Sequence, residues 1–178
     1  MPPANVGTDV TTTEVDELKQ RLQASRERLL TAIAGVTEEQ FKRRPEPSES
    51  DTRWSIAETL AHLLAAERLW STRIEAAFEA DNTPVTASQP DWNDEQSKLG
   101  RFAPVPQLVH GLLASQRQMQ LLIERASNTP GALERGVMHS TRGRLTVREM
   151  LDRFGIVVID EHAARIEALR VIVGAKPV

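Results

Sequence analysis

The stretch that decides the fold is WSIAETLAHL, residues 54–63. Ser55 and Glu58 have the spacing of a capping box, in which each side chain satisfies a backbone N–H at the start of a helix. Trp54 directly precedes this cap and can pack back on the first turn. The stretch therefore predicts a helix over residues 56–80, with His62 in its second turn.

Apolar residues at helical spacing predict three more long helices. The first covers residues 14–34, and the third covers residues 104–126 and begins at prolines, which are tolerated in a first turn. A second capping box, Thr146 with Glu149, begins the last helix, which runs to Gly174. Because no strand-like alternation is found, the pattern predicts an all-α fold, a four-helix bundle.

The second and third helices are joined by a long connection, residues 81–103. It contains Pro84, Pro90 and Gly100 but no sustained hydrophobic period. An irregular loop of this length is unusual inside a compact domain. We expect it to cross the end or the side of the bundle, with Trp92 as its anchor.

Composition limits the classes of function. A chain of 178 residues, 40% hydrophobic and 26% charged, suits one domain, expected at residues 13–174. A net charge of -3 gives no reason to expect a nucleic-acid partner, which usually requires a basic surface. The chain has no cysteine, so any bound metal would have nitrogen and oxygen ligands.

The sequence shows no segment that would target the protein to a membrane or span one. Residues 1–12 are rich in proline, glycine and threonine, and we expect a mobile tail there instead of a signal peptide. No apolar run approaches the roughly 20 residues of a membrane span. We therefore expect a cytoplasmic protein.

Two histidines are candidates for a metal site inside the bundle. His162 belongs to the apolar stripe of the last helix, and His62 shares a helix face with Ala66 and Leu69, so both are expected to face inward. His110 points away from most apolar neighbours and is expected at the surface. A lone inward histidine is also commonly a hydrogen-bonded core residue, so the pattern leaves that interpretation open.

Four segments together resemble the DinB/YfiT-like superfamily. They are WSIAETLAHL at residues 54–63, PDW at 90–92, HSTRGRLTVREML at 139–151 and DEHAARIEALR at 160–170. The likeness covers most of the chain, from about Glu14 to Val173. It implies a helical bundle found in metal-dependent enzymes, some hydrolase-like and some thiol-dependent transferases or isomerases, and many of them homodimers.

The resemblance also implies a metal site, with one histidine from the second helix and two, spaced four apart, from the last. By position these ligands of a divalent ion, Zn or Ni, fall on His62, Val158 and His162. Valine has no atom that can bind a metal, so this chain departs from the family pattern at one ligand.

Several nearby residues are candidates for the missing ligand. Glu58 lies one turn from His62 on the same helix face and is the first choice. Glu161 is a weaker candidate, and Asp160 should point elsewhere because it lies far around the helix from His162. His139, in the loop before the last helix, is another possibility.

These observations support two main hypotheses of function. In the first, His62, His162 and a third group such as Glu58 bind an ion whose hydroxide attacks a small substrate. In the second, the bundle has lost its metal and is a small-molecule binder or a stress-related dimeric scaffold.

A thiol-dependent transferase is a variant of the first hypothesis. It requires a pocket for a low-molecular-weight thiol, whose sulfur the ion would activate. Arg73 and Arg165 would then pair with a substrate carboxylate, although arginines on helices usually lie at solvated faces.

Overall fold

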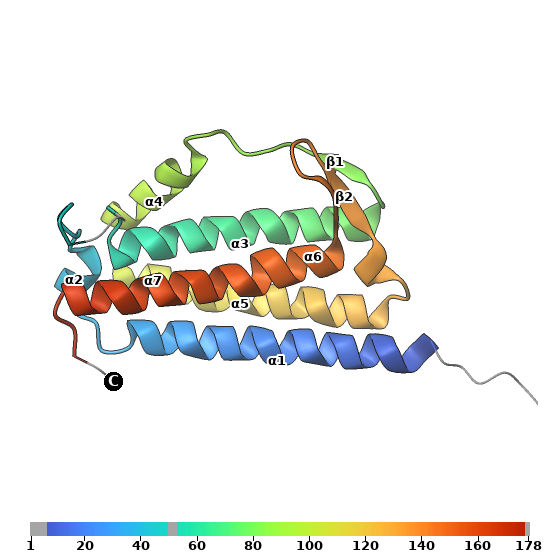
Figure 1. Ribbon diagram of the computed structural model, residues 1–178, viewed down its shortest axis with the longest axis horizontal. Coiled ribbons are helices and arrows are strands. Elements are labelled where there is room, and N and C mark those ends of the chain that lie inside the picture. The colour runs from blue at the N-terminus through green and yellow to red at the C-terminus, as the bar shows by residue number, and fades with distance from the viewer. Residues whose placement is uncertain (1–6, 50–52, 177–178) are drawn as a thin grey trace, which may run out of the picture.

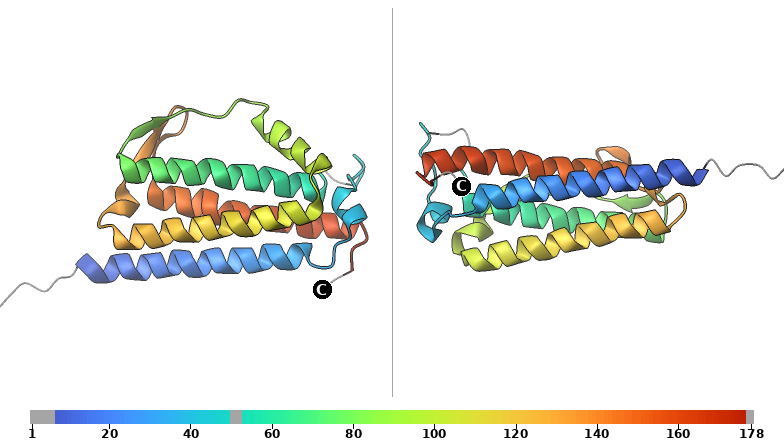
Figure 2. Two further views of the ribbon diagram at one scale, coloured as in Figure 1. Left: turned by 180° about the vertical axis from the view of Figure 1, so that it is seen from behind. Right: turned by 90° about the horizontal axis from the view of Figure 1, so that it is seen from below.

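The computed structural model describes residues 7–49 and 53–176 and shows a bundle of four long helical segments (Figure 1). The first three are α1 (Gly7–Ile33), α3 (Ile56–Glu79) and α5 (Val105–Asn128). The fourth consists of α6 (Val147–Asp152), a wider π-helical turn (Arg153–Val157) and α7 (Val158–Ile172). The four segments run lengthwise beside one another in both further views (Figure 2). The predicted four-helix bundle is confirmed.

The helix α1 begins earlier than expected. It starts at Gly7, whereas the sequence pattern predicted a helix over residues 14–34, so residues 7–12 are helical. Helix propensity is a weak guide to where a helix begins, and no apolar period marks this turn. The rest of the expected tail, residues 1–6, lies outside the described residues.

The core is formed by apolar side chains from all four helical segments. Its fully buried members include Leu29, Ile56, Leu60, Leu63, Ile74, Leu112, Met119, Ile123, Met150, Leu151, Ile159 and Ile166. They recur at helical spacing, so each helix buries one stripe and the hydrophobic effect holds the stripes together. A short helix, α2 (Glu38–Lys42), follows α1 and buries Phe41 against this core. Among the described residues, no helix is long and apolar enough to cross a membrane.

The connection between α3 and α5 is not irregular, which corrects the expectation for residues 81–103. It contains β1 (Thr83–Val85) and α4 (Trp92–Phe102). Strand β1 pairs in parallel with β2 (Gly136–His139), which pairs antiparallel with β3 (Gly143–Thr146). Strands of three or four residues are too short to show a clear alternation, so no sequence pattern predicted this sheet.

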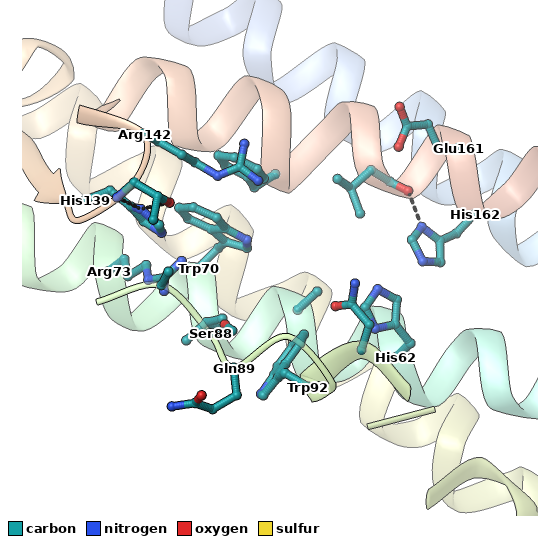
Figure 3. Close-up of a pocket in the computed structure, with 17 residues that line it drawn as sticks. His62, Trp70, Arg73, Ser88, Gln89, Trp92, His139, Arg142, Glu161 and His162 are labelled. Carbon is teal, nitrogen blue, oxygen red and sulfur yellow. Dashed lines mark hydrogen bonds between the residues drawn. The ribbon is translucent and has the colours of Figure 1, made fainter. Parts of the chain in front are cut away.

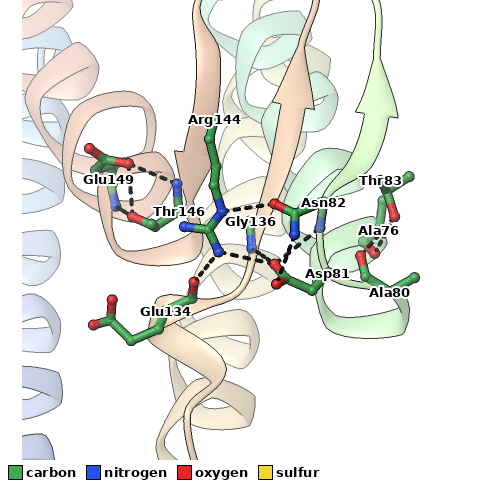
Figure 4. A network of polar contacts seen from close by, with 10 residues as sticks. All are labelled: Ala76, Ala80, Asp81, Asn82, Thr83, Glu134, Gly136, Arg144, Thr146 and Glu149. Carbon is green, nitrogen blue, oxygen red and sulfur yellow. Dashed lines mark hydrogen bonds and ion pairs between the residues drawn. The ribbon is translucent and has the colours of Figure 1, made fainter.

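A polar network attaches the end of α3 to the hairpin of β2 and β3 (Figure 4). The Asp81 carboxylate accepts a hydrogen bond from the Gly136 amide at 2.8 Å and pairs with Arg144 at 3.1 Å. Arg144 also donates to Oδ1 of Asn82 and to the carbonyl of Glu134, at 2.8 and 2.7 Å. The network holds the small sheet at one end of the bundle, beside the start of α6.

A polar cluster lies inside the bundle, centred on Glu67 of α3. Glu67 is fully buried, and neither of its carboxylate oxygens has a hydrogen-bond partner among the described residues. Burial raises its pKa to about 7, while the nearby Ser115 hydroxyl and the Arg26 guanidinium oppose that rise only in part. The charged form of Glu67 is therefore poorly compensated in the folded protein.

Glu67 should make stability depend on pH. Because its pKa rises from 4.5 to about 7 on folding, the folded state binds the proton more tightly, and the free energy of unfolding falls as the pH rises through this interval. The full loss is about 3 kcal/mol above the interval. Urea unfolding of Glu67→Gln should lack this component, so the variant gains stability over the parent as the pH rises.

The control is Glu79→Gln, which changes an exposed carboxylate on the same helix. It should follow the pH dependence of the parent protein. A stability difference between parent and Glu67→Gln that stays constant with pH would contradict the assignment.

Candidate functional site

A cavity of about 380 Å³ opens between α3, the connection to α4, the hairpin turn and the last helical segment (Figure 3). His62, Trp70 and Arg73 line it from α3, and Trp92 lines it from α4. The hairpin contributes His139 and Arg142, and the last segment contributes Phe154, Val158, Glu161 and His162. The cavity is large enough to hold a metabolite-sized molecule. It is lined by both aromatic and polar groups, as ligand sites usually are.

His162 is held in one tautomer by the backbone of its own helix. It is 8% exposed, and its Nδ1 lies 2.7 Å from the carbonyl oxygen of Val158. Because a carbonyl only accepts, Nδ1 carries the proton and Nε2 keeps its lone pair. Nε2 is buried and has no hydrogen-bond partner in the part of the chain that the structure describes.

His62 lies against His162 within an aromatic cluster. The centroids of the two imidazole rings are 5.3 Å apart, and the Trp54 and Trp92 rings lie 5.0 and 5.8 Å from His62. Its Nδ1 is buried and, like Nε2 of His162, has no partner among the described side chains and backbone groups. The structure thus brings together both histidines that the sequence selected, each with one free buried nitrogen.

Both imidazoles are neutral at physiological pH. Burial lowers the pKa of His62 to about 4, assisted by the neighbouring His162 and Arg165 and opposed by Asp94. Burial also lowers the pKa of His162 to about 4, where Arg165 assists and the Val158 carbonyl opposes. A neutral imidazole can accept a hydrogen bond or bind a metal ion through its free nitrogen.

Val158, which the family resemblance places at the third ligand position, lies at the wall of this cavity. Its side chain lines the space beside His162 but offers no donor atom, and its carbonyl already accepts from His162. Within residues 7–49 and 53–176, no three histidine, aspartate or glutamate side chains are placed to hold one metal ion. The residues therefore fit two ligands of a divalent ion and fall one short of a catalytic site with three protein ligands.

Glu58 has a different role from the predicted ligand. It is fully buried, and its Oε2 accepts from the Ser55 amide at 2.8 Å and from Arg44 at 3.1 Å. Its Oε1 accepts from Arg101 at 2.6 Å. Burial acts to raise the pKa of this carboxyl, but the Ser55 amide and the two arginines outweigh it and lower the pKa. Both oxygens are occupied, and Glu58 does not line the cavity.

The other candidates for the third ligand also lie apart from the histidine pair or at its margin. Asp160 faces Arg28 at 3.9 Å, as expected from its position around the helix. Glu161 lines the cavity but is exposed, and His139 lies at the opposite end, 6.1 Å from Trp70. His110 is exposed, as expected.

Sequence reasoning missed the second, basic end of the cavity. Arg73 lines this end, as the hypothesis of a thiol-dependent transferase required. Arg165 does not line the cavity and lies over the Trp54 ring at 5.6 Å. Arg142 joins Arg73 from the hairpin turn, directly before Gly143, whose φ of 74° makes the turn. A glycine directly after Arg142 is compatible with a turn, but only the small sheet shows that this turn reaches α3.

Replacing Glu58 with glutamine should affect stability and leave the histidine pair intact. The variant keeps the volume but leaves Arg44 and Arg101 without their carboxylate, which should lower the free energy of unfolding by about 2 kcal/mol. Thermal and urea unfolding would measure this loss.

The matched control is Glu149→Gln, at the same position of the second capping box. Glu149 accepts from the Thr146 amide at 2.8 Å but is exposed, so its loss should stay below about 1 kcal/mol. Equal losses in the two variants, or a change in metal affinity caused only by Glu58→Gln, would speak against the anchoring role.

Comparison with known proteins agrees with the fold and the motifs. The sequence model of the DinB superfamily matches residues 21–155. The solved structure of YfiT from Bacillus subtilis, described as a probable metal-dependent hydrolase with an unusual four-helix bundle topology, superposes with a TM-score of 0.63. The match covers 99% of this chain and 94% of that one at 19% identity, so it shows a shared fold. No curated protein matches. The chain belongs to the DinB superfamily.

Proposed function

We propose that this protein binds a small organic molecule in the cavity beside His62 and His162, without a resident catalytic metal. The observation that carries the proposal is Val158, which stands where the family pattern has a ligand and whose carbonyl is occupied by His162. A catalytic divalent ion usually has three protein ligands and an open position for water. Two imidazoles should hold such an ion only weakly.

The histidine pair suits a ligand that donates hydrogen bonds. Nε2 of His162 is a buried acceptor, and Nδ1 of His62 is a buried ring nitrogen that donates or accepts according to its tautomer. Neither has a partner among the described residues, and a buried polar group in that state costs free energy. A hydroxyl, amide or thiol of a bound molecule would satisfy them. The Trp70, Trp92 and Phe154 rings provide an apolar wall for the remainder of the molecule.

A second candidate is a metal-dependent hydrolase or thiol-dependent transferase. It is favoured by the proton on Nδ1 of His162, because metal-binding histidines usually donate their other ring nitrogen to a carbonyl or carboxylate. His62 and His162 would hold Zn or Ni, and a donor atom of the ligand would complete the set. The description of YfiT as a probable metal-dependent hydrolase supports this candidate. When bound, the ion would act as a Lewis acid on the ligand.

Restoring the third ligand separates the two candidates. The parent protein, purified without chelator and desalted, should retain well below one Zn or Ni per chain by elemental analysis. Val158→His should retain about one, with an affinity at least about 100-fold higher, since even losing a residue that orients a ligand costs 10- to 100-fold.

Two further variants control this test. Val158→Leu changes the wall without adding a donor and should behave as the parent. His162→Ala in the Val158→His background should lose the ion. One tightly held ion in the parent protein, removed by both His62→Ala and His162→Ala, would replace our proposal with the second candidate.

The homodimer that the family resemblance implies stays a prediction. Light scattering of the eluting protein would test it.

A further inference from the structure

Two arginines without carboxylate partners meet at the end of the cavity opposite the histidine pair (Figure 3). Arg73 is only 6% exposed, and its Nη2 donates to the Thr86 carbonyl at 2.7 Å. Arg142 comes from the hairpin turn and is exposed. Among the described residues, no aspartate or glutamate forms an ion pair with either of them, although many other arginines of this chain have such a partner.

The two positive charges act on each other. Burial lowers the pKa of Arg73, and the neighbouring Arg142 lowers it further. Burial and the same two arginines also lower the pKa of His139 beside them. The carboxylate that lines this cavity, Glu161, lies at the histidine end and does not offset the charge (Figure 3). Positive charge therefore gathers at one end of the cavity without compensation from the described residues.

A purely structural role explains only part of this arrangement. The Arg73 guanidinium packs 4.4 Å over the Trp70 ring and bonds the Thr86 carbonyl, so it helps to hold the connection against α3. That role does not require a second guanidinium beside it. Like charges are disfavoured in a partly buried place unless a counter-charge joins them.

An aromatic surface lies directly beneath the two arginines. The Trp70 and Phe154 rings stack with centroids 3.5 Å apart and planes within 2° of parallel. Arg73 lies over the first ring and Arg142 lies 5.6 Å from the second. The two rings cover each other's faces, so an apolar group in the cavity would meet their edges, next to the positive charges.

We propose that Arg73 and Arg142 form an anion subsite that binds the carboxylate or phosphate of a small organic ligand. The apolar body of the ligand lies along Trp70 and Phe154, and its other end reaches His62 and His162. Guanidinium groups form charge-assisted hydrogen bonds with both kinds of anion. The subsite rests on the proposed function, because it names the class of molecule that the same cavity takes.

The test compares charged and neutral forms of one probe. Para-hydroxyphenylpropionate has a carboxylate for the arginines and a hydroxyl for the histidines, and its primary amide differs only in charge. Quenching of tryptophan fluorescence should show the acid binding at least about tenfold more tightly than the amide, the difference expected for a charge-assisted contact. Phenyl phosphate and inorganic phosphate form a parallel arm. Tighter binding of phenyl phosphate than of inorganic phosphate or the carboxylic acid would assign the subsite to phosphate esters.

Arg142→Gln is the main variant, because an exposed turn residue can change without loss of the fold. It should abolish the preference for the acid, and so should Arg73→Gln where its melting temperature shows a folded protein. The matched control is Arg153→Gln. Arg153 is also exposed and also lies 5.6 Å from the Phe154 ring, but it does not line the cavity. Its replacement should leave the preference unchanged.

The outcomes separate this inference from the function on which it rests. Equal binding of acid and amide, both lost in His62→Ala, would overturn the anion subsite and leave a small-molecule site at the histidines. An acid preference that survives Arg142→Gln would also overturn the subsite. If neither form of the probe nor phenyl phosphate binds at millimolar concentration, both proposals fail.

Discussion

The buried carboxylate of Glu58 is the interaction on which the shape of the site depends. It accepts from the start of α3, from Arg44 before it and from Arg101 of α4, so one side chain joins three segments. A charge without exposure is tolerated only with such partners, which makes the three contacts interdependent. At the same point Gly100 lies so close to α3 that a Cβ there would be 2.3 Å from the Ala57 carbonyl oxygen. The other end of α4 carries Trp92, and the anchored helix therefore fixes one wall of the cavity.

The direction of helical side chains explains why Glu58 does not join the histidines. Residues four apart share a helix face, so the sequence placed Glu58 next to His62. Side chains on a helix lean toward its N-terminus, however, and a capping box turns the glutamate further back to the cap. His62 instead contacts Trp54, Trp92 and His162. The capping box and the ligand hypothesis both require the Glu58 carboxylate. In the structure it accepts from the nearby Ser55 amide.

The parts of the molecule that sequence could predict are those set by local periodicity. Apolar spacing and the two capping boxes located α3, α5 and the last helical segment, and the stripe of that segment placed His162 inward. Helix α4 was missed because its outward residues include Leu99 and Phe102, 59% and 85% exposed, which blur its period. The closeness of Arg73 and Arg142 depends on the parallel contact of β1 with β2. No local sequence pattern encodes such a contact.

A valine at position 158, where the family resemblance implies a metal ligand, bears on what the rest of the site could select. In a site with a resident ion, the metal would be the largest local charge and would dominate the choice of ligand. Here the histidine end is neutral, and the positive charge lies at the arginine end, where Arg73 and Arg142 lie over the stacked Trp70 and Phe154 rings. Under the proposed function, selection would depend on the length of the ligand, because only a molecule that reaches past Trp70 and Phe154 could satisfy both ends at once.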